Sequence, residues 1–522
     1  MLSRIHSGCV MGIEAYAVDV EIDVAGGLPS FSVIGLPDTS IRESRDRIRS
    51  AIKNSGFSFP AKRITVNLSP ADVKKEGAGF DLPIALGILA ATGLIEQEKL
   101  DAILFRGELS LNGKLKHFRG ALPLAISLKD KYKTFIVPKA TAIETANVGG
   151  IEVFGAGSLR EVVEHLKDVK QLKAVENVPR YAASRNRSLD VDFSDVKGQD
   201  HVKRGLEVAA SGGHNVLMIG PPGSGKSMLA KRFGTILPHL SYEESLETTK
   251  IYSTAGQLKH MSLLEDRPFR SPHHTISYAA MVGGGQWAAP GEISLAHNGV
   301  LFLDEFPEFR RDVLETLRQP IESGEVTISR VERSLTYPCR FILISAMNPC
   351  PCGYFTDPKK ECRCSPHQIQ RYLSKISGPL LDRIDIHLEV PRLDYNELSG
   401  KRNGKTSEEI RTRVERTRNI QIERARIQGT KDEGRRTKDD NSRIRYNASL
   451  DTKDVERFCI LSKDAEELLK TAILELGISA RAYDKILKIS RTIADMETSE
   501  TIESHHVSEA IGYRSLDRSL WT

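Results

Sequence analysis

The sequence predicts an α/β protein of about three domains, with two sheet-containing parts followed by a helical one. The length of 522 residues suggests this number, because domains typically span ~100–200 residues. Before residue 165, apolar and polar residues alternate in several short segments, which indicates strands. Near the middle, the apolar run 215–219 leads into a glycine-rich turn and a helix-like segment, an order typical of α/β units that bind phosphate.

The composition, with 27% charged and 40% hydrophobic residues, is that of a soluble globular protein. No run reaches the ~18 apolar residues that a membrane span needs, and the longest candidate, 82–95, is interrupted by Pro83 and two glycines. The N-terminus lacks the apolar stretch of a signal peptide, so we expect a cytoplasmic protein without a membrane partner. In that compartment, seven cysteines argue against a disulfide framework.

The net charge of +5 is unevenly distributed along the chain. Residues 401–445 hold 15 Lys and Arg against 8 Asp and Glu. Such a basic block is usually a solvated face or a flexible loop, and less often a nucleic-acid surface.

Residues 1–165 are predicted to form a compact α/β domain. The segment 81–92 predicts an apolar helix with Asp81 as its N-cap. Residues 104–115 indicate two strands joined by a tight turn. The other expected elements are strands at 15–24, 63–68 and 134–138 and a helix at 40–54. Residues 166–190 are polar and loosely patterned, which favours a linker.

The glycine-rich turn after residue 219 matches the complete P-loop pattern. Its glycines let backbone N–H groups face phosphates, and the following helix adds the partial positive charge of its N-terminus. We expect Lys226 to reach the β- and γ-phosphates of ATP and the Ser227 hydroxyl to hold Mg²⁺. The predicted nucleotide-binding residues are Gly220, Pro221, Pro222, Gly223, Ser224, Gly225, Lys226 and Ser227.

A second apolar strand, at 299–303, ends in Asp304 and Glu305. We expect Asp304 to hold Mg²⁺ through water and Glu305 to polarise the attacking water. By itself this pattern would also suit a buried strand that ends in two surface acids. The P-loop about 80 residues upstream favours the nucleotide site.

Four cysteines gather within fifteen residues, in a pattern that could close one tetrahedral structural Zn²⁺ site. Reduced free thiols and redox pairing are the alternatives. Two pairs of adjacent histidines, 273–274 and 505–506, would diverge on a helix, so we expect no metal there. The clustered cysteines are Cys350, Cys352, Cys362 and Cys364.

Two other segments are candidates for contact with a substrate. Residues 281–287 place three glycines beside Trp287, which suits a mobile loop with an aromatic stacking surface or, equally, a tryptophan packed in the core. Residues 326–337 alternate twice around a turn and predict a hairpin with Arg330 and Arg333 near its tip. Two arginines on a projecting hairpin would bind phosphates well.

The order of elements in residues 1–165, with the stretches 75–83, 106–113 and 135–138, resembles the Lon-protease-like (ribosomal S5 domain 2-like) domain of ComM/YifB proteins. Lon proteases use a Ser/Lys dyad. This chain has neither residue at the matching positions, near Gly79 and around 119–121. We therefore expect a scaffold or assembly domain without proteolytic activity.

The next part of the chain resembles the AAA+ modules of the magnesium-chelatase class, beginning with the motif at 192–199. Asn348 follows an apolar strand at 341–346 and matches sensor 1, although Asn beside Pro is also an ordinary turn. The glycine segment with Trp287 resembles the insert in helix 2 of this class. The predicted hairpin stands where such proteins carry a pre-sensor 1 hairpin that faces the pore of a ring.

Two arginines also match this class. Arg383 lies in a Leu-Leu-Asp-Arg-Ile-Asp motif and matches the arginine finger, which would reach the γ-phosphate bound by a neighbouring subunit. The alternative for Arg383 is a salt bridge with Asp382 or Asp385. Arg481, at the start of a late helix, matches sensor 2 of the helical lid.

These resemblances cover nearly the whole chain and point to the ComM/YifB family of magnesium-chelatase-like proteins. The family resemblance implies a hexameric AAA+ ATPase that acts on single-stranded or branched DNA, with branch migration during recombination of incoming DNA in natural transformation. A metal-chelatase-type ATPase and an ATP-dependent protein remodeller remain as alternatives. The expected divisions are the Lon-like domain at 1–165, the linker at 166–190, the AAA+ core at 191–392 with a cysteine insertion at 350–364, and the helical lid at 393–522.

Overall fold

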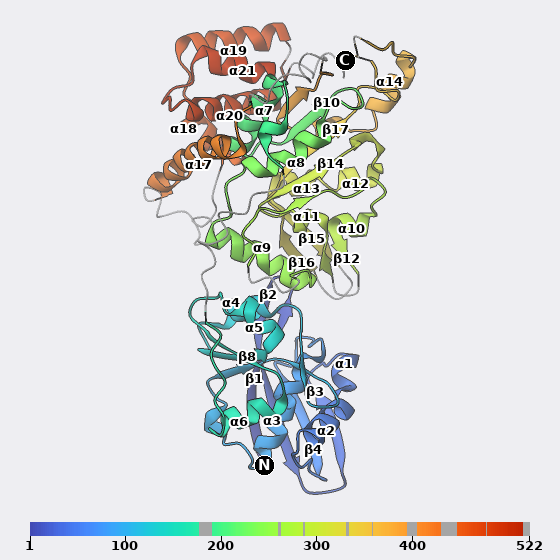
Figure 1. Ribbon diagram of the computed structural model, residues 1–522, viewed down its shortest axis with the longest axis vertical. Coiled ribbons are helices and arrows are strands. Elements are labelled where there is room, and N and C mark those ends of the chain that lie inside the picture. The colour runs from blue at the N-terminus through green and yellow to red at the C-terminus, as the bar shows by residue number, and fades with distance from the viewer. Residues whose placement is uncertain are drawn as a thin grey trace.

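The computed structural model describes residues 1–176, 191–258, 263–285, 288–329, 334–355, 357, 359–393, 404–429, 446–476 and 478–514. The molecule is elongated, with one sheet near the N-terminus, a second sheet in the middle and a group of helices beyond it (Figure 1). In the described ranges, no helix combines the length and the hydropathy that crossing a bilayer requires.

The N-terminal sheet has seven strands in the order β3-β4-β2-β1-β5-β8-β9. Its centre is a long antiparallel hairpin of β1 and β2, in which Val18, Val20 and Ile22 are fully buried. This alternation of buried and open positions follows from the period of two along a strand. The strands are β1 (Leu2–Met11), β2 (Glu14–Ala25), β3 (Ser30–Ile34), β4 (Arg63–Ser69), β5 (Ile103–Phe105), β8 (Thr134–Pro138) and β9 (Glu152–Ala156), and a separate short hairpin pairs β6 (Glu108–Leu109) with β7 (Leu115–Lys116).

Helices pack against this sheet. Most of the strands and helices expected in this domain are confirmed. The predicted N-cap at Asp81 is wrong, because Phe80 is the N-cap and Asp81 is the first helical residue of α3. The Asp81 carboxylate is instead buried and accepts a hydrogen bond from Arg47 Nε at 3.0 Å. The helices are α1 (Thr39–Arg42), α2 (Ser44–Asn54), α3 (Asp81–Ala91), α4 (Ala121–Leu128), α5 (Lys139–Thr145) and α6 (Leu159–Leu166).

The first part of the expected linker, 166–190, still packs against the N-terminal domain. The Val175 N–H donates to the Val153 carbonyl at 2.8 Å, and Leu172 packs against the N-terminal core. These two apolar residues hold an otherwise polar stretch against the domain. Most of the remaining linker, 177–190, lies outside the described residues.

The second sheet has five parallel strands in the order β11-β14-β17-β10-β18. The three strands predicted here are confirmed as β10, β14 and β17, and every residue in them is buried. Continuous apolar runs are expected when helices cover both faces of a parallel sheet. The strands are β10 (Val216–Ile219), β11 (Phe269–Arg270), β14 (Val300–Leu303), β17 (Ile342–Met347) and β18 (Ile386–Glu389), and the main flanking helices are α7 (Asp200–Gly212), α8 (Lys226–Ile236) and α9 (Tyr242–Ala255).

Shorter elements lie between these strands. The predicted hairpin is confirmed as β15 paired with β16, and its tip, 330–333, is outside the described residues. The elements are α10 (Tyr278–Val282), β12 (Gly283–Gly284), β13 (Ala289–Pro290), α11 (Glu292–Leu295), α12 (Arg311–Glu315), α13 (Arg318–Ser323), β15 (Glu325–Ser329), β16 (Ser334–Pro338), α14 (Pro366–Leu373) and α15 (Gly378–Leu381).

The C-terminal part is helical, as expected. Within the expected helical lid, residues 452–476 form two helices, α18 and α19. The helices are α17 (Ser407–Gly429), α18 (Thr452–Phe458), α19 (Lys463–Leu476), α20 (Ala480–Met496) and α21 (Ser504–Gly512).

The basic block at 401–445 was expected to be a solvated face or a flexible loop, and this is wrong for several arginines of α17. Arg418 is 4% exposed and donates to the Ala210 carbonyl at 2.9 Å. Arg413 pairs with Glu207 at 2.6 Å, and Arg411 donates to the Thr235 carbonyl. These side chains therefore hold α17 against α7 and α8.

The N-terminal sheet meets the core through the tip of its long hairpin. The Thr254 hydroxyl, on α9, donates to the Gly12 carbonyl at 3.0 Å. The Tyr242 hydroxyl, at the start of the same helix, donates to the Asn147 carbonyl at 2.8 Å. Helix α9 therefore makes both of these hydrogen bonds to the N-terminal domain.

Candidate nucleotide-binding site

The loop after β10 has the backbone of a phosphate-binding turn. Gly223 and Gly225 have φ of +76° and +94°, values that favour glycine. Gly225 is the N-cap of α8, so the first free N–H groups of this helix open toward the loop. This arrangement can hold a polyphosphate without further rearrangement of the strand or helix.

Lys226 is held inside this loop. Its side chain is 8% exposed, and Nζ donates to the carbonyls of Gly220 at 2.7 Å and Pro221 at 2.9 Å. Nζ also lies 3.3 Å from the amide oxygen of Asn348, which brings two predicted residues together. Burial lowers the pKa of Lys226 to about 8, and the Asp304 carboxylate opposes this shift.

The predicted magnesium ligands also meet. Ser227 Oγ donates to Asp304 Oδ2 at 2.5 Å, where β14 ends beside α8. A hydroxyl and a carboxylate are oxygen ligands of the kind that Mg²⁺ prefers, and Mg²⁺ usually keeps several waters beside them. These residues therefore fit a magnesium–nucleotide complex.

Glu305 has a backbone conformation that is rare for its residue type. Its φ is +53°, in the left-handed region, and its N–H bonds to the Asp304 side chain at 3.0 Å. Such strained backbone persists only where the surroundings impose it, and it is common at functional sites. The His274 ring nitrogen Nδ1 lies 3.1 Å from Glu305 Oε2.

Two residues of this site, His274 and Gln199, were not predicted from the sequence. His274 was dismissed because adjacent histidines were expected to diverge, but residues 271–277 are not helical and the rings of His273 and His274 lie 4.1 Å apart. Gln199, in the left-handed region at φ +54°, donates to the carbonyls of Ser224 at 2.9 Å and Pro391 at 3.0 Å. In the sequence, Gln199 could have been noticed as the last residue of the motif 192–199.

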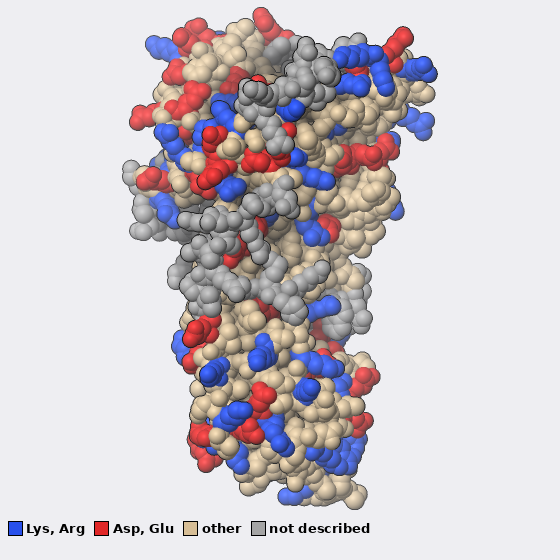
Figure 2. Space-filling model, viewed as in Figure 1, with Lys and Arg blue, Asp and Glu red and all other residues tan. Residues whose placement is uncertain are grey.

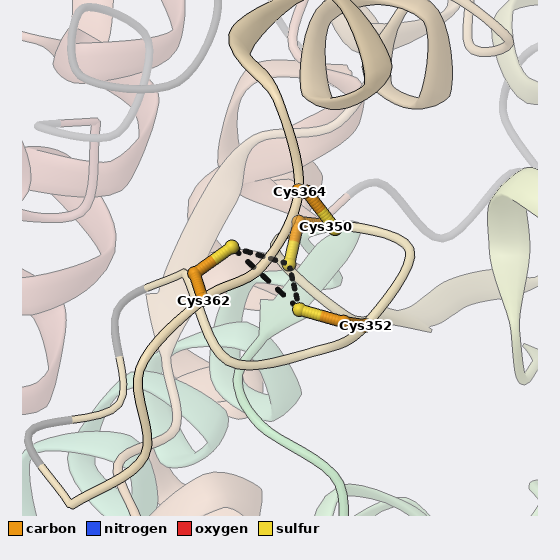
Figure 3. A group of neighbouring side chains, drawn as sticks. All are labelled: Cys350, Cys352, Cys362 and Cys364. Carbon is orange, nitrogen blue, oxygen red and sulfur yellow. Dashed lines mark hydrogen bonds between the residues drawn. The ribbon is translucent and has the colours of Figure 1, made fainter.

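The four clustered cysteines converge at one point (Figure 3). Their sulfur atoms all lie within 4.8 Å of one another, and the Cys350, Cys352 and Cys362 sulfurs are 3.4–3.7 Å apart. Tetrahedral zinc with Zn–S bonds of about 2.3 Å requires sulfurs about 3.8 Å apart. The Gly353 N–H points at Cys350 Sγ at 3.2 Å, a contact that stabilises a bound thiolate. This donor set fits a closed zinc site.

The segment that carries the four cysteines, 350–364 (the cysteine turn), touches the P-loop. Cys350 comes two residues after Asn348, and Gly353 has φ of +84°. A Cβ on Gly353 would lie 2.5 Å from Pro222 Cδ, so only glycine allows this approach. The shape of the cysteine turn therefore bears directly on the nucleotide loop.

The two predicted arginines do not contact the P-loop within the described residues. Arg383 pairs with Glu322 at 2.6 Å and donates to the carbonyl of Arg318, so the alternative of a bridge to Asp382 or Asp385 is wrong. Arg481 instead reaches Asp382 Oδ2 at 3.3 Å. Both arginines therefore belong to one surface beside α15.

The predicted substrate-contacting residues Trp287, Arg330 and Arg333 lie outside the described residues. The segments that carry them do meet, because the Tyr337 hydroxyl, on β16, donates to the Ala288 carbonyl at 2.9 Å. The glycine loop and the hairpin are thus packed together.

An exposed basic surface, missed in the sequence, surrounds α14, where blue side chains gather at the upper right of Figure 2. Its members lie within the cysteine segment 350–364 or shortly after it, on and next to α14. Its exposed members are Lys359, Lys360, Arg363, Arg371 and Lys375.

The second histidine pair also converges, contrary to expectation. His505 and His506 both approach Glu497 Oε2, at 3.1 Å and 3.2 Å. His506 Nδ1 accepts the Glu503 N–H at 2.9 Å, so its Nε2 carries the proton when the ring is neutral. A protonated Nε2 donates to Glu497 and has no lone pair for a metal.

A parallel sheet in this strand order, with a P-loop after β10 and an acid pair after β14, defines a P-loop ATPase module of the AAA+ class. Family profiles described as "Magnesium chelatase, subunit ChlI", "Subunit ChlI of Mg-chelatase" and "Magnesium chelatase, subunit ChlI C-terminal" match residues 192–398, 20–141 and 404–514.

The chain is 43% identical over 522 residues to competence protein ComM of Haemophilus influenzae, covering 99% of this chain and 98% of that one. It is 43% identical over 520 residues to the uncharacterized protein YifB of Escherichia coli, with the same coverage. A more distant likeness, 23% over 70% of this chain and 42% of the relative, links it to zygotic DNA replication licensing factor mcm6-A of Xenopus laevis. The chain belongs to the ComM/YifB family of magnesium-chelatase-like proteins.

Proposed function

We propose that the chain is an ATP-hydrolysing motor that assembles into a hexameric ring and acts on DNA. Its task would be branch migration that promotes recombination of incoming DNA in natural transformation. The observation that carries the ATPase part is the convergence of Lys226, Ser227, Asp304 and Asn348 at the carboxyl ends of three parallel strands. Substrates bind at this edge of open α/β sheets.

Each residue has a role that follows from its position. The loop N–H groups would cradle the phosphates, and Lys226 would exchange its two carbonyl partners for β- and γ-phosphate oxygens. Ser227 and Asp304 would hold Mg²⁺, which neutralises charge on the phosphates when bound. Glu305 would orient the attacking water, and His274 would hold the Glu305 carboxylate in place. Asn348 would help to position the water near the γ-phosphate.

Ring assembly would complete the site from a neighbouring subunit. Arg383 and Arg481 share one surface and are held there by Glu322 and Asp382. An arginine brought to a γ-phosphate by a neighbour stabilises the charge of the transition state. We propose that both arginines act across the subunit interface.

The DNA part has three supports. Two relatives are named as a competence protein and a DNA replication licensing factor. The hairpin of β15 and β16 packs against the residue that follows the glycine loop, and we propose that Trp287, Arg330 and Arg333 contact DNA. The basic surface around α14 adds exposed cations suited to phosphates. Such a motor would work in the cytoplasm.

The cysteine cluster would hold one structural Zn²⁺. Four thiolates leave no open coordination position, so the metal would shape the turn rather than take part in hydrolysis. N–H donors from Tyr354 and Arg363 lower the pKa of Cys352 against the effect of burial, whereas burial raises the pKa of Cys350 and Cys364. A thiolate at neutral pH is the form that binds zinc.

The test is the ATPase rate with no DNA, single-stranded DNA, duplex DNA and a four-way junction, with Lys226→Ala as the inactive control. We expect stimulation by DNA that Lys226→Ala abolishes. Charge reversal of Lys360 and Arg363 should weaken DNA stimulation about tenfold and reduce its salt dependence, because phosphate contacts release counterions. Lys53→Glu, an exposed site in the N-terminal domain, is the matched control.

Robust hydrolysis that no DNA changes would contradict the DNA motor. Stimulation by an unfolded protein such as casein, without a DNA effect, would instead favour a protein remodeller.

A further inference from the structure

The segment 382–385, which lies between α15 and β18 and carries the proposed arginine finger, is held by α20 at both of its ends. At the first end, Arg481 Nη1 lies 3.3 Å from Asp382 Oδ2. At the second end, Lys485 Nζ lies 3.1 Å from Asp385 Oδ1. Arg481 and Lys485 are four residues apart on α20, so they lie one turn apart on the same face of this helix.

These two contacts differ in their exposure to water. The Arg481 and Asp382 side chains are 66% and 44% exposed. Those of Lys485 and Asp385 are 14% and 13% exposed, and Lys485 Nζ also donates to the Ile384 carbonyl at 2.9 Å. Exposed ion pairs contribute little to stability, whereas breaking a buried pair leaves an uncompensated charge. The Lys485 contact is therefore the fixed end of this connection, and the Arg481 contact is the end that a ligand can replace.

Asp385 is tied to the nucleotide-binding sheet as well as to Lys485. Its Oδ2 accepts the Asn215 N–H at 3.0 Å, and its own N–H donates to the Asn215 carbonyl at 3.0 Å. His214 Nδ1 lies 3.7 Å from the same carboxylate oxygen. Burial alone would raise the pKa of Asp385, but Lys485 and the two groups just named hold this pKa below its usual range. The carboxylate is therefore charged at neutral pH.

Asn215 extends this connection to Arg383 and to a second strand. Its Nδ2 donates to the Arg383 carbonyl at 3.2 Å, and its Oδ1 accepts the Leu343 N–H, on β17, at 2.8 Å. Asn215 directly precedes β10, the strand that leads into the P-loop, and β17 leads to Asn348. The backbone at Arg383 is therefore fixed to the two strands that lead to the nucleotide loop and to Asn348.

We propose that Lys485 is a positioning residue that sets Arg383 and Arg481 for the nucleotide of a neighbouring subunit. It acts through its ion pair with Asp385, which joins α20 to the segment 382–385, so the two arginines move as one unit. Arg481 can exchange its exposed carboxylate partner for phosphate oxygens while Lys485 keeps α20 in place. This inference rests on the proposed function, because both arginines must act across a subunit interface.

The first experiment compares ATP hydrolysis by Lys485→Met and by the wild type. We expect kcat to fall about tenfold or more, because a misplacement of about 1 Å can cost roughly a hundredfold in rate. KM for ATP and stabilisation by Mg–ADP should change little, since the P-loop is untouched. Lys485→Arg should recover part of the rate. The matched control is Lys488→Met, because Lys488 lies on the same helix but donates to the Ala448 carbonyl at 3.4 Å.

The second experiment mixes Lys485→Met and Lys226→Ala proteins in equal amounts. Each variant lacks one half of a site between subunits, so a Lys485→Met P-loop that faces a Lys226→Ala neighbour has every group it needs. We expect the mixture to reach about a quarter of the wild-type rate, the share of such head-to-tail interfaces in randomly mixed rings. A Lys485→Met subunit that is merely misfolded would gain nothing from mixing. Arg383→Ala mixed with Lys226→Ala is the reference mixture.

The outcomes separate this inference from the proposed function. A wild-type protein that does not hydrolyse ATP would contradict the proposed function. Wild-type hydrolysis with an unchanged kcat for Lys485→Met, or with only a raised KM, would contradict the positioning role alone. So would recovery in the reference mixture without recovery in the Lys485→Met mixture. If neither mixture recovers, the arginines do not act across an interface, and both proposals fall.

A further variant covers the case in which Lys485→Met does not fold. The double variant Lys485→Gln with Asp385→Asn removes both charges, so neither is left buried without its partner. The same kcat loss, unchanged KM and recovery on mixing are expected of it. Wild-type kcat in the folded double variant would overturn the positioning role.

Discussion

Two buried lysines in this chain lie beside glycine-containing segments and have opposite surroundings. Lys226 donates to two loop carbonyls and faces the Asn348 amide oxygen. Lys75 has no acceptor within reach among the described residues. The P-loop therefore supplies backbone acceptors to its lysine, whereas the N-terminal segment offers Lys75 Nζ no hydrogen-bond acceptor among the described residues. The comparison teaches that a buried ammonium is compensated only where the backbone turns carbonyl groups toward it.

Replacing the better-partnered lysine should have the largest effect. Lys226→Met removes the charge that binds phosphates, and we expect the ATPase rate to fall roughly 10²–10³-fold, as for loss of one key donor. Stabilisation by Mg–ADP should also disappear, while the nucleotide-free variant should unfold at or above the wild-type temperature because a buried charge is gone. Steady-state hydrolysis and thermal unfolding measure both effects. Hydrolysis near the wild-type rate would show that Lys226 does not serve the phosphates.

The contact between the cysteine turn and the P-loop predicts an intermediate effect. Cys350→Ser should release bound zinc and lower the ATPase rate about tenfold, because Gly353 would no longer be held against Pro222. Metal analysis and hydrolysis assays on the same preparations test this. Cys459→Ala, far from the cluster in sequence, should keep both zinc and activity. Full activity of the zinc-free Cys350→Ser protein would show that the cysteine turn does not influence the nucleotide loop.

Another prediction concerns stability rather than activity, at a third buried ionisable group, Glu144 on α5, which is 6% exposed. Burial raises its pKa to about 8, with the Ala121 N–H opposing. The folded state therefore holds a proton that the unfolded state releases near pH 4.5, so stability contributed below that pH is lost as pH rises through about 8. Glu144→Gln should be more stable than the wild type by about 2–4 kcal/mol at pH 8 and show a flatter pH profile.

Thermal unfolding at pH 5, 7 and 8 measures this difference, with exposed Glu152→Gln as the control. Equal pH profiles for Glu144→Gln and the wild type would mean that water reaches the carboxylate.

Local sequence was enough for the parts of the site that are contiguous. The P-loop, the acid pair and the three buried strands follow from runs of residues whose spacing maps directly onto one turn or one strand. The cysteine cluster could be proposed for the same reason. The positions of Trp287, Arg330 and Arg333 stay predictions, since they lie outside the described residues.

Contacts between residues far apart in the sequence could not be predicted from local patterns. His274 was set aside on a helical assumption that the extended loop 271–277 does not satisfy. The alternative considered for Arg383, predicted as an arginine finger, was a salt bridge with Asp382 or Asp385, but it bonds to Glu322 on α13. The arginines of α17 were taken for a solvated face because a charge run carries no information on which helix it packs against.

The amino-acid sequence alone determined the class of the protein, the location of its nucleotide loop and the identity of the candidate metal ligands, because each depends on residues close together in the chain. The tertiary structure decided which side chains meet: His274 with Glu305, Gly353 with Pro222, and Arg481 with Asp382. It also decided that the side chains of Lys75 and Arg106 are buried. Partners and counter-ions are chosen when strands and helices pack, and packing brings together residues that no local pattern connects.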